Sequence, residues 1–213
     1  CFKPEIIPEM QQENDLTQEY EKLLASAQIP FEGKTYTLSQ LTPLKSDPDD
    51  ARRLAAWQAD AKWSMEHAAE LDELYDKLVH LRDSMGKKMG YEGYTTLGYY
   101  RMNRNCYTKE DVEKFRAAVQ KYLVPVADKI CRKQAERLGK TYPLSFADLA
   151  LEFRSGNPRP MGTPDDILAQ GMKFYGELSP ETKVFFRTML DNELLDVLST
   201  EGKQAGGYCT NLG

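Results

Sequence analysis

Histidines are the residues from which a metal site in this chain would be built, and the sequence contains two. His67 lies three residues before Glu70, so one helix face could offer a metal ion two ligands. His80 lies between Asp76 and Asp83 at helical spacing. On one helix the two histidines would be about 20 Å apart, too far to share a metal ion. A metal site needs three or four ligands, so we interpret both as solvated helix-face residues that form ion pairs.

Cysteine is the other candidate ligand or nucleophile. The four cysteines form no C-x-x-C pair, and no second catalytic partner is evident for a Cys–His nucleophile. We expect reduced thiols that act as small buried hydrophobic residues. For Cys1 we favour a cut or proteolytic boundary over a processed lipoprotein start. The cysteines are Cys1, Cys106, Cys131 and Cys209.

Acid pairs and glycines could also support catalysis or phosphate binding. Asp49-Asp50 and Asp165-Asp166 fall in expected first helical turns, where the helix dipole explains them. Gly202, Gly206 and Gly207 do not match G-x-x-x-x-G-K-[ST], and we expect no helix after them. These residues alone form no catalytic group.

Tyrosines gather beside two arginines between residues 91 and 107. Their hydroxyl and guanidinium groups could line a cleft that binds peptide carbonyls or a carboxylate. Alternatively, the rings pack inward and the hydroxyls lie at the rim, which is the interpretation we favour. The cluster comprises Tyr91, Tyr94, Tyr99, Tyr100, Tyr107, Arg101 and Arg104.

The elements that position these residues are predicted to be mainly helical. Apolar spacing predicts a helix over about Pro8–Ser26, and Pro, Gly and β-branched residues predict a small hairpin over Ile29–Leu38. Asp47 is the expected cap of one unbroken helix on the order of 60 Å long, which ends near Gly86 or Gly90.

The second half of the chain continues this helical pattern. A short helix is expected within residues 91–107, and Thr108 is expected to cap a helix that Pro125 kinks and Gly139 ends. Residues 140–162 read as an ordered loop with a short helical or extended insert at FADLALEF. Thr163–Leu178 and Ser179–Ser199 are predicted as two more helices, each with a cap followed by proline. The prediction is a mainly α, multi-helix body with long antiparallel helices and one small β-hairpin.

Composition limits the classes of function. The net charge is −5, 29% of residues are charged, and Lys and Arg are mixed with Asp and Glu. This describes a soluble, mildly acidic protein and argues against a nucleic-acid partner. No apolar run approaches 18 residues, and the N-terminus lacks the apolar stretch of a signal peptide, so we expect no membrane partner. The wide spacing of the cysteines fits reduced thiols in a cytoplasm, which is the location we expect.

Several stretches resemble the oligoendopeptidase F branch of the thimet-oligopeptidase-like zinc metallopeptidases. They follow the family's order and run from about residue 10 to residue 210. They read EYEKLLASAQIPFEGKTYTLSQ, KKMGYEGYTTLGYYRMNR, FRSGNPRPMGTPD, YGELSPETKVFF and EGKQAGGYCT.

The resemblance implies a large, clamshell-like helical peptidase with a deep channel that short peptides enter. It also implies zinc, held by an H-E-x-x-H helix and a further glutamate, with the motif glutamate as general base. These 213 residues contain no H-E-x-x-H. We therefore expect one mainly helical region, residues 1–213, without the catalytic zinc region, without bound metal and inactive alone.

Two hypotheses follow for the function. In the first, the chain is a non-catalytic scaffold and channel-wall fragment. Gly206, Gly207 and Tyr208 would be its substrate-binding residues, and the missing C-terminal catalytic part would be its partner. Such a fragment would expose apolar surface and self-associate. Alternatively, it is a free-standing helical module that binds a peptide or protein on its tyrosine- and arginine-lined face.

Overall fold

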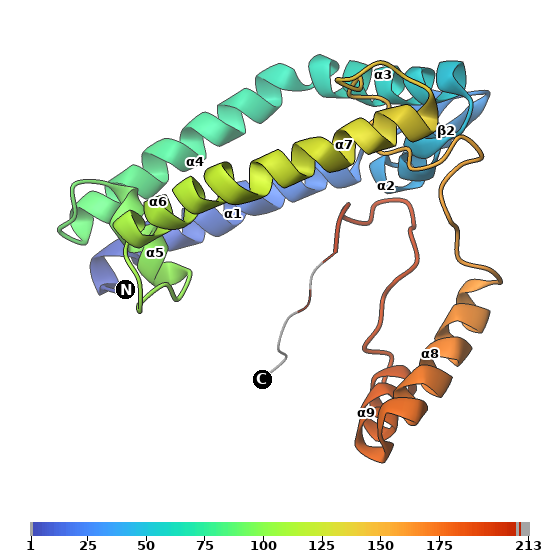
Figure 1. Ribbon diagram of the computed structural model, residues 1–213. Coiled ribbons are helices and arrows are strands. Elements are labelled where there is room, and N and C mark those ends of the chain that lie inside the picture. The colour runs from blue at the N-terminus through green and yellow to red at the C-terminus, as the bar shows by residue number, and fades with distance from the viewer. Residues whose placement is uncertain (1, 208, 210–213) are drawn as a thin grey trace. The chain divides into compact units, whose positions relative to one another are not determined.

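The computed structural model describes residues 2–207 and 209 and confirms a mainly α fold with one antiparallel hairpin (Figure 1). The described residues form two compact units. The smaller unit, Asn157–Thr200, contains a pair of helices and is called the hairpin unit. The larger unit holds the other described residues, including the β-hairpin. Both units are mainly helical. That residues 1–213 form one region of a larger peptidase stays a prediction.

The larger unit contains most of the secondary structure. Its elements are α1 (Ile7–Ala25), β1 (Ile29–Phe31), β2 (Lys34–Tyr36), α2 (Leu38–Leu41), α3 (Asp50–Glu66), α4 (Ala68–Lys88), α5 (Tyr94–Arg101), α6 (Lys109–Ala118) and α7 (Val124–Leu138). Short 3-10 helices cover Pro4–Ile6 and Thr42–Ser46, and a π-helical turn covers Val119–Leu123. The hairpin unit contains α8 (Pro164–Leu178) and α9 (Pro180–Asp191). In the described part of the chain no helix is both long and apolar enough to cross a membrane.

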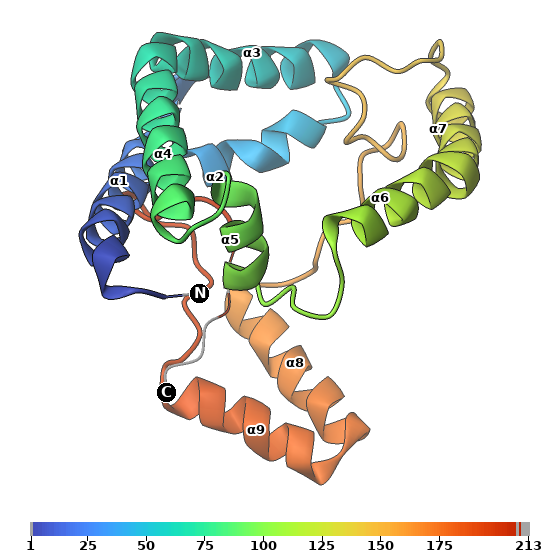
Figure 2. The ribbon, with the colours of Figure 1, turned by 90° about the vertical axis from the view of Figure 1, so that its left-hand side faces the viewer.

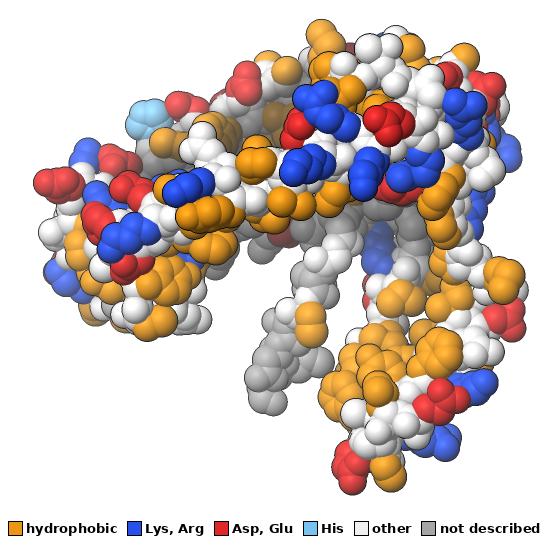
Figure 3. All heavy atoms as spheres, viewed as in Figure 1, with side chains coloured by type: hydrophobic (Ala, Val, Ile, Leu, Met, Phe, Trp, Pro, Cys, Tyr) orange, Lys and Arg blue, Asp and Glu red, His pale blue; other side chains and the backbone are white. Residues whose placement is uncertain are grey.

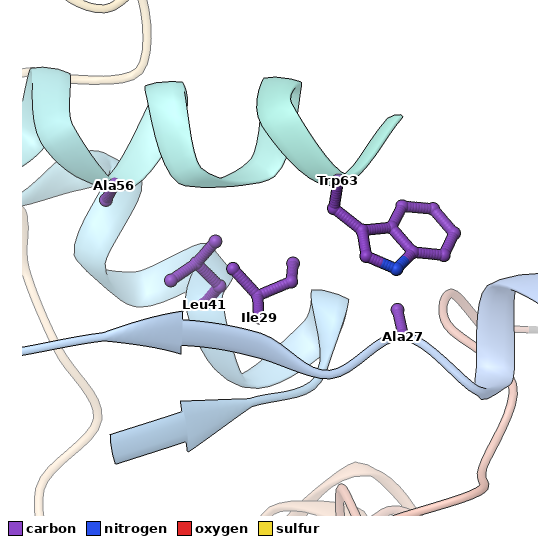
Figure 4. Packing of buried hydrophobic residues seen from close by; sticks show 5 residues of the cluster. All are labelled: Ala27, Ile29, Leu41, Ala56 and Trp63. Atoms are coloured by element: carbon purple, nitrogen blue, oxygen red, sulfur yellow. The ribbon is translucent and has the colours of Figure 1, made fainter. Parts of the chain in front are cut away.

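The predicted β-hairpin is confirmed and helps to form the first core. Ile29 lies opposite Tyr36, and the strands are joined by Glu32 and Gly33. Both turn residues have positive φ, +49° and +75°, which is typical of the tight turns that match strand twist. The hairpin, α2 and α3 enclose a buried cluster made by Ala27, Ile29, Leu41, Ala56 and Trp63 (Figure 4).

The second core joins α1, α4 and α5. Leu16 of α1 packs with Leu74 and Leu81 of α4. Further along, Ile6, Met85 and Leu97 form a neighbouring cluster. Gly86 permits the approach of the loop before α5, because a Cβ there would lie 2.3 Å from the carbonyl oxygen of Gly93. These contacts connect the first helix to residues about 80 positions later.

The prediction of one unbroken helix from Asp47 to about Gly90 is wrong in two respects. The chain breaks at His67, whose φ of −105° and ψ of 10° end α3 and begin α4 in another direction (Figure 2). The helix also begins later, since Asp49 is the cap and accepts a hydrogen bond from the Arg52 amide at 2.7 Å. Asp47 instead accepts from the amide of Asp49 at 2.9 Å. The break has a tertiary cause, because α3 packs on the hairpin and α4 packs on α1.

The helix after Thr108 passes Pro125 as predicted. Thr108 and Asp111 form a reciprocal capping box. The turn before Pro125 is π-helical, which accommodates a residue that has no amide hydrogen to donate. Gly139 ends α7 with φ of +68°, a conformation that favours glycine. The FADLALEF segment contains turns over residues 146–150 and irregular backbone over residues 151–153, so the predicted short helical or extended insert is not formed as a helix or a strand.

A buried arginine fastens the start of α3 to the loop after α7. The side chain of Arg53 is 1% exposed. It donates hydrogen bonds to the carbonyl oxygens of Asp47 (2.7 Å) and Ala147 (3.0 Å), and it forms ion pairs with Asp50 and Asp148. Burial raises the pKa of Asp148, but Arg53, Ser145 and Lys140 outweigh it and lower the pKa below its ordinary value. The buried charge is therefore matched by fixed partners.

The hairpin unit is a pair of helices held around one aromatic side chain. Thr163 caps α8 and Ser179 caps α9, as predicted. Phe186 is buried and stacks on Tyr175 with ring centroids 4.6 Å apart. Gly171 leaves room for the Phe186 ring, which would lie 3.1 Å from a Cβ at that position.

The predicted extension of the last helix to Ser199 is wrong. α9 ends at Asp191 and is capped by Asn192. Glu193 then takes a positive φ of 54°, and the amide of Leu194 bonds back to the carbonyl of Met189. This turn resembles the usual glycine-containing helix end, but no glycine marks it, so the residue types did not predict where the helix ends.

Candidate functional site

The predicted substrate segment lies at the end of the larger unit. Gly206 has φ of +101°, which side-chain-bearing residues rarely adopt, and both Gly206 and Gly207 are exposed. A Cβ at either glycine would meet open space, so the backbone there is accessible to another chain. Upstream, Gln28 donates a hydrogen bond to Glu201 at 2.7 Å, which connects the segment to the residue before β1. Tyr208 lies outside the described residues.

The two histidines take different roles. His80 is exposed and faces Asp76, with Nδ1 3.4 Å from the carboxylate, as expected for helix-face pairing. His67 instead lies at the break between α3 and α4, where its ring stacks on Trp63 at 4.4 Å. Within residues 2–207 and 209, no three His, Cys, Asp or Glu side chains are grouped as metal ligands would be.

The tyrosine- and arginine-rich segment is used mainly for packing. Tyr91 and Tyr94 pack against the core cluster of Ile6, Met85 and Leu97. Arg104 lies over the Tyr99 ring at 5.3 Å. Tyr100 and Tyr107 remain exposed. The packing interpretation is confirmed for Tyr91 and Tyr94.

The arginine of this segment completes a buried charge cluster that the sequence did not reveal. Glu13 of α1 is buried and accepts hydrogen bonds from Arg82 Nε and Arg101 Nη2, each at 2.7 Å. Arg101 also donates to the Tyr94 hydroxyl at 2.9 Å. Burial raises the pKa of Glu13, but the hydrogen bonds from Arg101 and Arg82 outweigh it and hold the pKa below its usual range. The cluster locks α5 and α4 onto α1.

Stability should therefore depend on the charge of Glu13. A carboxyl whose pKa is lower in the folded state stabilises the fold above its unfolded pKa, about 4.3, and this contribution disappears as the pH falls through the folded pKa. We expect Glu13→Gln to lower the urea midpoint at pH 7, and the gap from the unchanged chain to shrink below about pH 4. The exposed Glu5→Gln serves as the control and should leave the midpoint unchanged. A gap as large at pH 3 as at pH 7 would contradict this role of Glu13.

The cysteines differ from the prediction in burial. Cys106, Cys131 and Cys209 are free thiols, which agrees with the expected reduced state. The prediction that they are buried hydrophobic residues is wrong for Cys106 and Cys209, which are exposed, and Cys131 is half-buried. Cys1 lies outside the described residues. Cys106 and Cys209 therefore do not contribute to the core, contrary to the prediction.

Comparison with solved structures decides the family resemblance. The structure of PZ peptidase A with an inhibitor matches with a TM-score of 0.94 and 44% sequence identity over 98% of this chain. An oligoendopeptidase F from Bacillus anthracis str. Ames matches with a TM-score of 0.94 and 42% identity. A further oligoendopeptidase F structure has a TM-score of 0.95 and 42% identity. The resemblance to oligoendopeptidase F is confirmed.

The match covers nearly all of this chain but a minor part of each oligoendopeptidase F-type structure. It covers 98% of this chain in each case, and 37% or 38% of the other chain. No family model and no curated protein matches the sequence. The chain therefore corresponds to about 37% of the length of an oligoendopeptidase F structure.

Proposed function

We propose that the chain is a non-catalytic scaffold and channel wall of a zinc metallo-oligopeptidase that cleaves short peptides with metal-activated water. One observation carries the proposal: 42–44% identity to oligoendopeptidase F-type structures, two of them named oligoendopeptidase F and one PZ peptidase A, over 98% of the chain. Short peptides as substrates and a cytoplasmic location are part of the same proposal.

The described residues do not fit a zinc site. His67 is stacked on Trp63, His80 is paired with Asp76, and among the residues that the structure describes no third ligand accompanies either. Zinc, when bound, would activate water for attack on the peptide bond. We propose that its ligands and the general base belong to another part of the complete polypeptide, which is also the partner of this chain.

The contribution of this chain is to shape and hold the channel. Two buried charge clusters, centred on Arg53 and Glu13, fix α3 to the 147–148 turn and α1 to α4 and α5. Gly206 and Gly207 present bare backbone to solvent, and we propose that a peptide backbone approaches there, with Tyr208 beside it.

The alternative, a free-standing peptide-binding module, loses much of its structural basis. It depended on an open face of tyrosine and arginine side chains. Tyr94 and Arg101 are instead bonded to each other, and Arg101 is paired with Glu13. The scaffold proposal accounts for these internal contacts, because a wall must be held in place.

A peptidase assay tests the proposal. A quenched fluorescent oligopeptide is offered to the 213-residue chain and to the complete protein encoded by the same gene. We expect turnover only by the complete protein, abolished by a chelator and restored by zinc. Zinc-dependent turnover by the short chain, or none by a folded complete protein, would contradict the proposal.

A further inference from the structure

The helix formed by α6, the π turn and α7 carries an unusual apolar surface. Phe115, Val119, Leu123, Val126 and Ile130, the α6–α7 stripe, recur at intervals of four, four, three and four residues and so follow one side of the helix. Phe115 is 68% exposed, Leu123 57% and Ile130 62%. Figure 3 shows hydrophobic side chains along the edge of this helix.

The contacts that the larger unit makes with this helix are concentrated at its far end. Gln134 donates hydrogen bonds to the carbonyl oxygens of Leu149 (3.1 Å) and Leu151 (2.8 Å), and Ala135 and Leu138 are buried. From residue 109 to residue 133 no residue is buried, although every one of them is described. The stripe therefore lies on a stretch that the larger unit does not cover.

A regular apolar stripe on an uncovered helix indicates a contact surface. In a helix that only faced water, polar residues would be expected around the whole circumference. Here the apolar intervals of three and four residues continue across the π turn and past Pro125. That regularity favours a partner that is itself an extended, apolar element, such as a helix face.

The comparisons show how much polypeptide the relatives have outside the matched part. The relatives contain the matched fold with TM-scores of 0.94–0.95, but 37% or 38% of each of their chains accounts for it. We infer that the α6–α7 stripe is an internal packing surface, covered in the complete protein by the polypeptide outside this chain. The inference rests on the proposed function, since it takes the complete protein to be an oligoendopeptidase F-type peptidase. In the isolated chain the same stripe would mediate the predicted self-association.

Cysteine labelling tests this inference. Ile130→Cys and the control Glu136→Cys are each introduced after every native cysteine of the protein under test has been replaced by serine. Glu136 is exposed and lies on another side of α7. Both sites are then labelled with a maleimide in the dilute 213-residue chain and in the complete protein, with circular dichroism as a check of folding.

We expect both sites to react at similar rates in the short chain. In the complete protein the Ile130→Cys site should react at least about tenfold more slowly, because it opens only with local unfolding, whereas Glu136→Cys should change little. Equal rates at both sites in the complete protein would overturn the inference. So would equal slowing of both, or slow reaction of Ile130→Cys in the dilute short chain, which would indicate that its own segments or a second copy cover the stripe.

The same complete protein separates this inference from the proposed function. Peptide hydrolysis with an open Ile130→Cys site would overturn the packing surface and leave the peptidase assignment standing. A protected site in a folded protein that hydrolyses no peptide would support the packing surface and overturn the proposed function.

Discussion

Arg53→Met is expected to destabilise the larger unit by about 3 kcal/mol, because it removes one partner from a buried ion cluster. The substitution preserves much of the apolar length of the side chain but removes every hydrogen-bond donor. Asp148 would lose the guanidinium that balances its burial, and the carbonyl oxygens of Asp47 and Ala147 would lose a donor. Lys140, 3.2 Å from Asp148, still offsets part of the charge, which places the expected loss at the lower end for a broken buried pair.

Urea unfolding at pH 7 measures this loss, with Arg52→Met as a matched control. Arg52 is the neighbouring residue and also pairs with carboxylates, Glu32 and Asp47, but its side chain is 38% exposed. We expect the control to shift the midpoint only slightly, since exposed pairs contribute little. Equal effects of the two substitutions would show that the Arg53 cluster does not hold α3 to the 147–148 turn.

Phe186→Ala should have a comparable effect on the hairpin unit, with an expected cost of about 3 kcal/mol. Phe186 is the buried side chain between α8 and α9, where it stacks on Tyr175 and fills the space over Gly171. Alanine would leave a cavity between two helices that share few other buried side chains. A helix pair this small has little stability to lose, so local opening should become frequent.

Amide hydrogen exchange in the intact chain measures this effect. We expect protection of α8 and α9 to fall while that of α1 and α4 stays the same. The control is Phe185→Ala, because Phe185 is adjacent and 62% exposed. Unchanged protection after Phe186→Ala, or an equal loss after Phe185→Ala, would contradict the role of Phe186 as the centre of the hairpin unit.

Local signals in the sequence predicted much of the fold. Thr108, Thr163 and Ser179 act through their nearest neighbours, so their capping roles could be predicted without knowledge of the rest of the chain. The hairpin at Glu32-Gly33 and the helix end at Gly139 are local in the same sense.

Features decided by tertiary contacts could not be predicted in this way. No proline or glycine marks the break at His67, which arises because α3 and α4 pack on different partners. The Arg53–Asp148 and Glu13–Arg101 pairs join residues 95 and 88 positions apart, and nothing local indicates such pairing. An alignment of related sequences showing paired changes at these positions would have been the signal.

Prediction of the candidate site from the sequence was limited for a different reason. Gly206 and Gly207 were selected through the family resemblance, and the structure shows them exposed with open space around them. That geometry permits the approach of a peptide but does not by itself select one. The chemistry proposed for the complete protein depends on residues beyond those described.

The coding sequence that follows Gly213 tests the central claim most directly, namely that this chain is the scaffold of a longer zinc oligopeptidase. Sequencing the gene and its transcript should reveal an open reading frame that continues for several hundred codons and encodes an H-E-x-x-H segment. A stop codon immediately after Gly213, or a long continuation without that motif, would contradict the account.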